Sequence, residues 1–528
     1  MSLLSISNLS VHIHGTQVLQ DVSISVAPGQ IVALTGESGS GKSMTALAIM
    51  GLLPEGARAT GRIDLSGHAI LDMTDGQLCA VRGDEVGMVF QEPMTALNPV
   101  QTIGDQVAET ILIHEDTSKA EARRRAGQML ERVGLPNDAF PLSRYPHELS
   151  GGQRQRVVIA MAIARRPALL IADEPTTALD VTTQATILAL LGDLVQEFGM
   201  GLVMITHDLA VVADMADQIV VMRAGEVVEH GPTGEVLRNR RHPYTAMLFE
   251  ASRHKADLPA KTAGAPLLEC RNVVRDYALP RTRLLAPRAH FRAVNDVSFV
   301  LPRGGRFGLV GESGCGKSTL TRALLGLEPV QSGDILLDGA PVGRDPSIRR
   351  RISVVFQDPY GSFNPRHRVD RLITEPFFLL DDPPTGAARR DAIDEALTAV
   401  GLHAEDARKY IHEFSGGQRQ RIAIARALII RPEVIIFDEA VSALDVSVRA
   451  QVLDLLAQLV RDYDLSYLFI SHDLTVVRSI TDHVMVMRAG QIVEQGPTDQ
   501  VLSAPAHAYT QSLIDAAPVL PDFASAKA

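Results

Sequence analysis

The segment GESGSGKS spans residues 36–43, and the related segment GESGCGKS spans residues 311–318. Each follows an apolar run typical of a buried strand and precedes a run typical of a helix. Such a glycine-rich turn lets backbone N–H groups converge on phosphate oxygens at a helix N-terminus. Its lysine neutralises phosphate charge, and the serine after it can bind Mg²⁺. The sequence therefore predicts two nucleotide phosphate sites. Their residues are Gly36, Glu37, Ser38, Gly39, Ser40, Gly41, Lys42 and Ser43, and Gly311, Glu312, Ser313, Gly314, Cys315, Gly316, Lys317 and Ser318.

The two loops belong to a repeat that runs through the chain. From the second motif onward the two copies keep a constant separation, whereas the glycine loops lie farther apart, which indicates different insertions near the start of each copy. Because there are only two copies and each is large, the repeat indicates a duplicated domain. The paired motifs are LSGGQRQR from Leu149 and FSGGQRQR from Phe414, LLIADEP ending at Pro175 and VIIFDEA ending at Ala440, ITHDL and ISHDL around His207 and His472, and HPYT and HAYT around Tyr244 and Tyr509.

This duplication predicts two domains, at residues 1–251 and 267–515. The stretch 252–266, SRHKADLPAKTAGAP, lacks apolar periodicity and predicts an exposed linker. The Ala- and Pro-rich segment 516–528 predicts a flexible tail.

Composition narrows the class of protein. A chain of 528 residues is too long for one compact core, and its net charge of −11 argues against nucleic acid as the main partner. The three cysteines, Cys79, Cys270 and Cys315, are far apart, which indicates free thiols rather than disulfides or a thiolate metal site. The N-terminal segment is unlike a signal peptide, and no apolar run approaches the roughly 20 residues that span a bilayer. If the protein serves a membrane, other subunits are expected to supply the spans.

Two carboxylates close an apolar run in each copy, Asp173–Glu174 and Asp438–Glu439. This pattern fits a buried parallel strand whose carboxyl end faces a ligand. We expect the first acid to hold the Mg²⁺ shell and the second to polarise the attacking water. His207 and His472 follow the acid pairs at the same spacing in both copies, which favours a γ-phosphate sensor over a purely structural histidine.

The second motif of each copy, LSGGQ or FSGGQ, distinguishes between classes of protein that carry a phosphate loop. With LSGGQ at Leu149 and FSGGQ at Phe414, nearly the whole chain resembles the ATP-binding cassette (ABC) family. The resemblance implies an α/β fold of two P-loop ATPase cassettes, each a RecA-like parallel-sheet core with an antiparallel β subdomain and a helical signature subdomain. It also implies an intramolecular head-to-tail pair that holds two ATP molecules, each between one phosphate loop and the opposite signature. The implied signature contacts are Ser150, Gly151, Gly152, Gln153, Ser415, Gly416, Gly417 and Gln418.

Other residues match family elements. Gln91 and Gln357 resemble the Q-loop glutamines, which the family uses to link Mg²⁺ and the γ-phosphate to the membrane subunits. TALD ending at Asp180 and SALD ending at Asp445 resemble the D-loops. The helical subdomains would cover about residues 95–147 and 361–413. The implied cofactors are ATP and Mg²⁺, with Ser43, Gln91, Asp173, Ser318, Gln357 and Asp438 around the metal.

The two copies depart from each other at two positions. The adenine-stacking aromatic of the family matches Tyr277 in the second copy but Ile13 in the first, so nucleotide affinity is expected to differ between the sites. His12 or His14 is an alternative stacking partner in the first copy. Ala440 stands where the first copy has Pro175. Neither departure removes a hydrolysis residue, so both sites are expected to be competent.

Motifs near the Q-loops and the chain ends indicate a subfamily. EPMTALNP, DPYGSFNP, HPYT and HAYT resemble the ATPases of oligopeptide, dipeptide and nickel importers, and a fused pair resembles the microcin C/oligopeptide-type or glutathione-type importer ATPase. The implied function is ATP hydrolysis that drives peptide uptake. The implied partners are two integral-membrane permease subunits and an extracytoplasmic solute-binding protein, and the implied location is the cytoplasmic face of the inner membrane, as a peripheral subunit. No cysteine cluster follows the histidine motifs, so no iron–sulfur centre is expected.

Three alternatives compete with this interpretation. A soluble twin-cassette ATPase acting on ribosomes would normally carry a long charged linker, which this chain lacks. A DNA-repair cassette ATPase would carry zinc-binding insertions that three cysteines cannot supply. An importer for nickel, glutathione or another solute stays open, because the choice of solute lies in other subunits.

Overall fold

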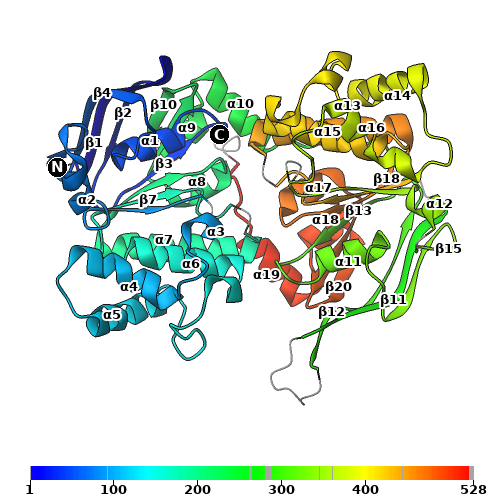
Figure 1. Ribbon diagram of the computed structural model, residues 1–528, viewed down its shortest axis with the longest axis horizontal. Helices are drawn as coiled ribbons and strands as arrows, with labels where there is room; N and C mark the ends of the chain where they lie inside the picture. The colour runs from blue at the N-terminus through cyan, green and yellow to red at the C-terminus, as the bar shows by residue number, and fades with distance from the viewer. Residues whose placement is uncertain are drawn as a thin grey trace.

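The computed structural model describes residues 2–91, 93–177, 179–260, 264–279, 288–343, 345–358, 361–442 and 444–522. Two halves of similar architecture lie side by side, the first running from β1 to α10 and the second from β11 to α19 (Figure 1). Each half combines one antiparallel sheet, one mostly parallel sheet and a group of helices. The repeat in the sequence is therefore a repeat in the structure.

The first half holds a four-stranded and a six-stranded sheet within the described residues. The four-stranded sheet has the order β2 (Thr16–Val26), β1 (Leu4–Ile13), β4 (Ala57–Leu65), β5 (His68–Ala69). The six-stranded sheet has the order β10 (Glu226–Pro232), β9 (Gln218–Arg223), β3 (Ile31–Thr35), β8 (Gly201–Ile205), β7 (Leu169–Asp173), β6 (Val86–Val89). The helices are α1 (Lys42–Ile49), α2 (Asp75–Val81), α3 (Pro93–Ala96), α4 (Ile103–His114), α5 (Lys119–Arg132), α6 (Gly151–Ala162), α7 (Val181–Phe198), α8 (Leu209–Met215), α9 (Thr233–Asn239) and α10 (Pro243–Ser252).

The second half repeats this plan over its described residues. Its four-stranded sheet has the order β12 (His290–Pro302), β11 (Pro266–Ala278), β14 (Ser332–Leu337), β15 (Ala340–Pro341). Its six-stranded sheet has the order β16 (Ile352–Val355), β17 (Val434–Asp438), β18 (Ser466–Ile470), β13 (Arg306–Val310), β19 (His483–Arg488), β20 (Gln491–Pro497). The helices are α11 (Lys317–Leu324), α12 (Pro346–Arg349), α13 (Val369–Ile373), α14 (Gly386–Ala399), α15 (Gly416–Leu428), α16 (Val446–Tyr463), α17 (Leu474–Ile480), α18 (Thr498–Ser503) and α19 (Ala508–Ala516).

The central strands of the large sheets are short apolar runs that are buried on both faces. IVALT, LLIAD and GLVMI form β3, β7 and β8, which are parallel neighbours, with Ile205 in register with both Leu34 and Asp173. Helices cover parallel sheets on both faces, so continuous apolar strands are the expected pattern. Because the carboxyl ends of parallel strands meet at one edge, the residues that follow these strands come together there.

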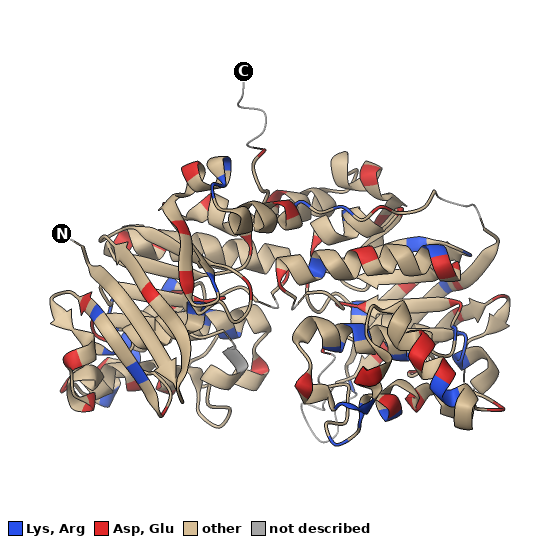
Figure 2. Cartoon of the chain, turned by 90° about the horizontal axis from the view of Figure 1, so that it is seen from above, with Lys and Arg blue, Asp and Glu red and all other residues tan. Residues whose placement is uncertain are grey.

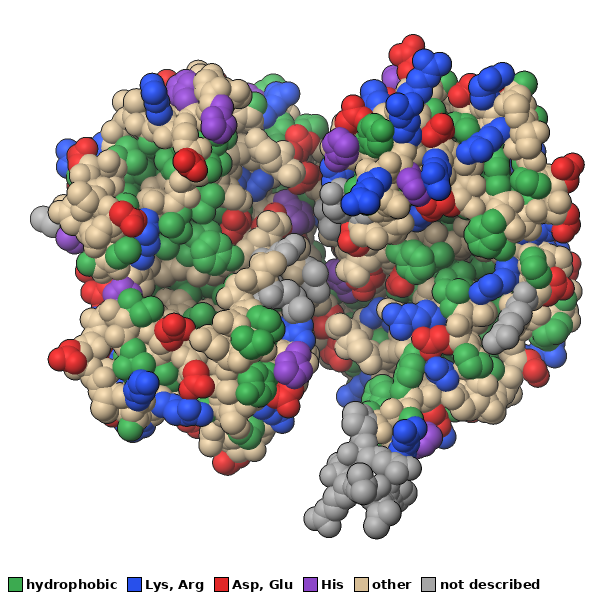
Figure 3. Space-filling view, in the orientation of Figure 1, with side chains coloured by type: hydrophobic (Ala, Val, Ile, Leu, Met, Phe, Trp, Pro, Cys, Tyr) green, Lys and Arg blue, Asp and Glu red, His purple; other side chains and the backbone are tan. Residues whose placement is uncertain are grey.

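The two halves are related head to tail. Helices α4 and α5 lie at the bottom of the first half in Figure 1, below α1, whereas α13 and α14 lie at the top of the second half, above α11. The helical part of each half therefore stands beside the sheet part of the other. In the space-filling view the halves meet along a narrow seam (Figure 3).

The C-terminal helix of each half packs on the opposite half. Helix α10 contacts α16, and α19 contacts α7. His254 Nε2, just beyond α10, lies 2.7 Å from Asp454 Oδ1 on α16. Past α19, Leu520 packs against the hydrophobic core of the first half, and Asp522 Oδ1 lies 3.2 Å from Arg253 Nη1. These contacts join the C-terminal part of each half to the other half.

In the cartoon of Figure 2, acidic and basic residues are interspersed along the chain in both halves. None of the helices in the described ranges has both the length and the apolar character needed to cross a bilayer.

Candidate functional site

Each phosphate loop depends on a glycine directly after the central strand. Gly36 has φ of 147° and Gly311 has φ of 153°, in a region that side chains with a Cβ rarely adopt. A Cβ at Gly36 would lie 2.2 Å from Met222 O, and one at Gly311 would lie 2.2 Å from Met487 O. Only glycine fits at either position, so the loop turns sharply against the neighbouring strand before α1 and α11 begin.

The loop lysines are held by the loops themselves. Lys42 Nζ donates to Gly36 O at 2.7 Å and to Glu37 O at 2.8 Å. Lys317 Nζ makes the same two bonds, to Gly311 O at 2.7 Å and to Glu312 O at 2.8 Å. Burial lowers the pKa of the Lys42 ammonium, although nearby carboxylates oppose that effect. A partly desolvated cation at the phosphate loop is suited to bind phosphate.

An amide, a hydroxyl and the histidine of the first half converge on one carboxylate, Glu174. Gln91 Nε2 donates to Glu174 Oε2 at 2.9 Å, and the Thr177 hydroxyl donates to the same oxygen at 2.8 Å. His207 Nδ1 lies 3.2 Å from Glu174 Oε1. Burial alone would raise the pKa of Glu174, but the hydrogen bonds and charges around it, those of His207 first, lower the pKa to about 2. This carboxylate is therefore ionised at neutral pH.

The same glutamates have strained backbones. Glu174 has φ of 47° and Glu439 has φ of 51°, in the left-handed region. That conformation costs a side-chain-bearing residue roughly 1–3 kcal/mol. Both copies keep a glutamate where a glycine would fit the backbone better, which is typical of a position that serves chemistry.

In the second half the corresponding residues line one cavity. His472 Nδ1 lies 3.6 Å from Glu439 Oε2. Burial, with help from the charge of Glu439, raises the pKa of Asp438 to about 6. The cavity encloses about 170 Å³ and is lined by Asp180, Ser313, Lys317, Ser318, Gln357, Asp438, Glu439 and His472. Asp180 comes from the first half, so the cavity is shared between the halves.

The residues near Asp173 fit a magnesium ion. Asp173 is 6% exposed, and its buried Oδ1 has no hydrogen-bond partner among the described residues. Ser43 donates a hydrogen bond to this carboxyl group, whose pKa is raised by burial. Carboxylate and hydroxyl oxygens are the donors that Mg²⁺ prefers. An orphaned carboxylate oxygen beside the phosphate loop therefore provides a vacant ligand for this metal.

Both signatures begin a helix. Ser150 and Ser415 cap α6 and α15, accepting bonds from Gln153 N at 3.3 Å and from Gln418 N at 3.4 Å. In return, the backbone N–H of each serine donates to the side-chain oxygen of the same glutamine. The second signature glycines pack closely, since a Cβ at Gly152 would lie 2.3 Å from Thr183 Cγ2 and one at Gly417 would lie 2.3 Å from Val448 Cγ1.

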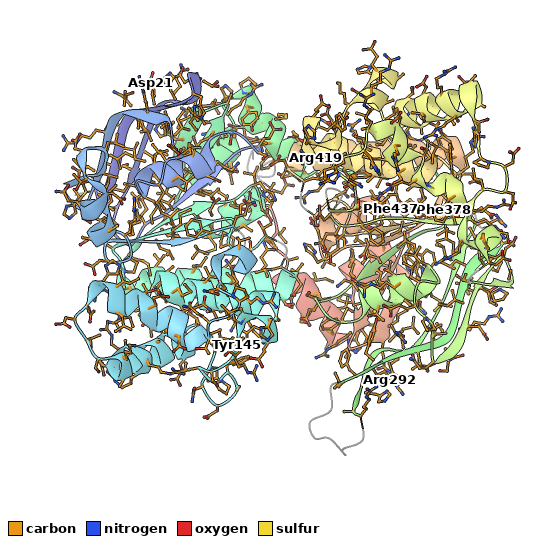
Figure 4. The ribbon with its side chains drawn as sticks, viewed as in Figure 1. Asp21, Tyr145, Arg292, Phe378, Arg419 and Phe437 are labelled. Atoms are coloured by element: carbon orange, nitrogen blue, oxygen red, sulfur yellow. The ribbon has the colours of Figure 1, made fainter. Side chains whose placement is uncertain are left out.

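The start of α15 faces the first half, as Arg419 shows by its place at the seam (Figure 4). The D-loop aspartates cross this seam in both directions. Asp445 Oδ1 accepts a bond from Ser38 N at 2.9 Å, and Asp180 Oδ2 accepts one from Ser313 N at 3.3 Å. Each phosphate loop is thus completed by a residue of the opposite half.

The positions expected beside the adenine have different surroundings in the two halves. Tyr277 donates a hydrogen bond to Glu328, and the Arg275 guanidinium lies over its ring, 4.6 Å from the centroid. Ile13 is partly buried against the core of the first half. The His14 ring lies against Gly56, where a Cβ would be 2.8 Å from its Cε1 atom.

Some residues near the site were not assigned from the sequence. Thr177 has no distinctive motif of its own. Tyr244 and Tyr509 were noted only as subfamily markers, yet their hydroxyls accept bonds from the backbone of the phosphate loops. Their recurrence at matching positions of the repeat was the available signal.

Comparisons with known proteins place the chain in a family. The family model described as ABC transporter matches residues 19–177 and 294–442. A second model, described as oligopeptide/dipeptide transporter, C-terminal region, matches residues 228–262 and 493–525. The glutathione import ATP-binding protein GsiA of Salmonella typhimurium is 45% identical over an alignment that covers 98% of this chain and 90% of that protein. The protein of the same name from Shigella boydii is 44% identical with the same coverage.

A solved ATP-binding cassette, described as a dimer in a post-hydrolysis state bound to ADP and Pi, is 31% identical. It covers 44% of this chain and 98% of its own, with a TM-score of 0.40.

The chain belongs to the ABC transporter family. The predicted class, a fused pair of nucleotide-binding cassettes with ATPase activity, is confirmed, and so is the predicted α/β cassette fold.

Proposed function

We propose that this chain is the ATPase subunit of an importer for peptides or small peptide-like solutes such as glutathione. The observation that carries the proposal is the similarity to glutathione import ATP-binding proteins along almost the whole chain. The C-terminal regions of both halves add support, because they match the oligopeptide/dipeptide transporter model. Oligopeptides and glutathione share amide-linked backbones with free carboxylates, so one solute class accounts for both similarities.

The geometry of the site supports a role for each residue. The two phosphate loops bind the phosphates of ATP through backbone N–H groups and through Lys42 and Lys317. Glu174 and Glu439 accept hydrogen bonds from the attacking water and align it with the γ-phosphate. His207 and His472 orient these carboxylates and donate toward the charge that develops on the phosphate. Ser150, Ser415 and the glycines after them supply the opposite wall of each site.

Mg²⁺ would be held by oxygen atoms of Ser43, Gln91 and Asp173 in the first half and of Ser318, Gln357 and Asp438 in the second. When bound, it would neutralise charge between the β- and γ-phosphates. Gln91 already contacts Glu174, so the chain itself couples the metal position to the hydrolytic carboxylate.

The assignment extends to domains and partners. Residues 1–251 and 267–515 would form the two cassettes, and the linker 252–266 would join them. Two permease subunits would dock on the helical parts, and an extracytoplasmic solute-binding protein would deliver the solute. The chain would then lie at the cytoplasmic face of the membrane as a peripheral subunit.

A pull-down of the tagged chain from native membranes, followed by mass spectrometry, tests the importer assignment. Two polytopic subunits and a solute-binding protein are expected to co-purify. The purified solute-binding protein should then bind peptides or glutathione. Recovery of ribosomal proteins without a permease would overturn the proposal.

A second experiment tests the catalytic assignment. The double variant Glu174→Gln plus Glu439→Gln removes both ionised carboxylates while keeping their size. Hydrolysis is expected to fall by about 100-fold or more, the range for loss of a general base, while ATP still binds and holds the cassettes together. Wild-type turnover by this variant would refute the roles given to the two glutamates.

A further inference from the structure

Two buried tyrosines connect the C-terminal parts of the halves to the phosphate loops. The Tyr244 hydroxyl accepts a hydrogen bond from Glu37 N at 3.0 Å, and the Tyr509 hydroxyl accepts one from Glu312 N at 3.1 Å. The tyrosines are 3% and 5% exposed. Each therefore contacts the loop residue that follows its first glycine.

The tyrosines are themselves held firmly. Tyr244 N donates to His242 Nδ1 at 3.1 Å, and this histidine caps α10. The Arg223 guanidinium lies over the Tyr244 ring, 5.1 Å from its centroid. In the second half Tyr509 N donates to His507 Nδ1 at 3.1 Å, and Arg488 lies 4.8 Å from the ring centroid. Backbone, ring and hydroxyl are each restrained, so the hydroxyl presents a stationary acceptor to the loop.

The side chains of the two loop glutamates, Glu37 and Glu312, point across the seam. The Ser447 hydroxyl, at the start of α16, donates to Glu37 Oε1. The Thr182 hydroxyl, at the start of α7, contacts Glu312 Oε1 at 2.7 Å and its own D-loop aspartate, Asp180, at 2.8 Å. Each loop glutamate thus joins a tyrosine of its own half to a hydroxyl of the opposite half.

We propose that Tyr244 and Tyr509 are positioning residues for ATP binding, acting through Glu37 and Glu312. The tyrosine anchors the backbone of the glutamate, and the opposite hydroxyl anchors its carboxylate. Together they hold the phosphate loop open for nucleotide and make its shape depend on the other half. We call this chain of contacts the tyrosine–glutamate–hydroxyl relay.

The relay has a physical basis in loop entropy. The loop is rich in glycine, which loses more conformational freedom on ordering than any other residue. A loop that is already ordered by its neighbours binds phosphate without that loss. Helix α10 carries Tyr244 and packs on α16, and helix α19 carries Tyr509 and packs on α7. The relay and the helix contacts therefore join the same parts of the two halves.

The variant Tyr244→Phe plus Tyr509→Phe tests the relay in the full chain with MgATP. Each change removes one hydroxyl and leaves the ring. Loss of one hydrogen bond is worth about 0.5–1.5 kcal/mol, so the KM for ATP is expected to rise about twofold to tenfold. The kcat should stay close to wild type, because the relay acts on the loop before and during hydrolysis alike. A purely structural role would instead lower kcat, through a smaller active fraction, and leave KM unchanged.

A double-mutant cycle adds a sharper readout. Ser447→Ala plus Thr182→Val removes the opposite ends of both relays and should raise KM to a similar degree. Combining all four changes should raise KM no further than the larger of the two effects, because within each relay the tyrosine and the opposite hydroxyl act through the same glutamate. Multiplied effects, or an unchanged KM in either variant, would overturn the proposal.

Two controls complete the design. Tyr463→Phe, at the end of α16, removes a hydroxyl far from the loops and should leave both constants unchanged. Melting curves identify a variant that fails to fold. If the double tyrosine variant fails to fold, the KM of the Ser447→Ala plus Thr182→Val variant alone tests the relay. Both of those residues lie at helix starts outside the hydrophobic cores.

Discussion

At the scale of single residues, the two nucleotide sites have the same acidic residues. They differ in the residue expected to lie against the adenine of ATP. Asp173–Glu174 and Asp438–Glu439 end equivalent strands, and both glutamates contact a histidine. Tyr277 presents a ring already backed by Arg275, whereas Ile13 offers only aliphatic surface. An aromatic ring stacks on a base more strongly than an isoleucine does, so the sites should differ in affinity rather than in chemistry.

An exchange of these residues tests that difference. Tyr277→Ile should weaken ATP binding at one site by about twofold to tenfold, as expected for loss of an aromatic contact worth roughly 0.5–1.5 kcal/mol. Ile13→Tyr should strengthen the other site by a similar factor. Titration calorimetry on the full chain reports both dissociation constants. Tyr277→Phe is the control and should bind as wild type, and equal affinities in the wild-type chain would refute the expectation.

At the scale of secondary structure, a group of charges ties the strands of the second half together. Glu433 precedes β17 and pairs with Arg303 after β12, at 2.6 Å, and with Arg351 before β16. Asp338, after β14, joins both arginines at 3.0 and 3.1 Å. The Arg351 hydrogen bond is the main reason that the pKa of Glu433 lies below its usual value.

This network predicts a pH-dependent stability. A carboxyl with a lowered pKa stabilises the folded state above its unfolded pKa, and that stability is lost as the pH falls through the folded value. Glu433→Gln should therefore cost about 0.5–1 kcal/mol near neutral pH, the range of partly exposed ion pairs. The gap between variant and wild type should close below the ordinary glutamate pKa of about 4.3. Melting temperatures across this range test it, with the exposed Glu55→Gln as control.

A gap that persisted in acid would mean that Glu433 stabilises through packing rather than charge.

How much the sequence predicts also depends on scale. The strand before each phosphate loop and the helix after it can be predicted from local sequence. The apolar pattern, the glycines and the lysine that indicate them all lie within one short segment. The structure has these elements as β3–α1 and β13–α11. The cluster around Glu174 is less local, but paired motifs predict it because parallel strands end at a common edge. The contact of Tyr244 with Glu37 joins segments far apart in the chain through a bond to a backbone amide. Such a bond leaves no mark on the partner's side chain, so sequence alone could not assign it.

At the scale of the whole molecule, one chain holds both members of the pair. Asp445 reaches Ser38 and Asp180 reaches Ser313, so each loop is completed from within the same polypeptide. A covalent linker turns the meeting of two cassettes into an intramolecular event with a high effective concentration.

Dilution tests this consequence. The specific ATPase activity of the full chain should stay constant from micromolar to nanomolar protein, because pairing does not depend on collisions between chains. Activity that fell in proportion to concentration would show that active pairs form between different chains. Sedimentation at the same concentrations provides the control for association.

The packing of Leu520 on the core of the first half has a consequence for biosynthesis. Domains generally fold in order as the polypeptide leaves the ribosome, so the first half can close before the second is made. Its apolar surface at this spot then stays uncovered until translation has passed through the entire second half. A nascent chain that stalls earlier displays an unprotected hydrophobic patch, the kind of surface that chaperones and proteases recognise.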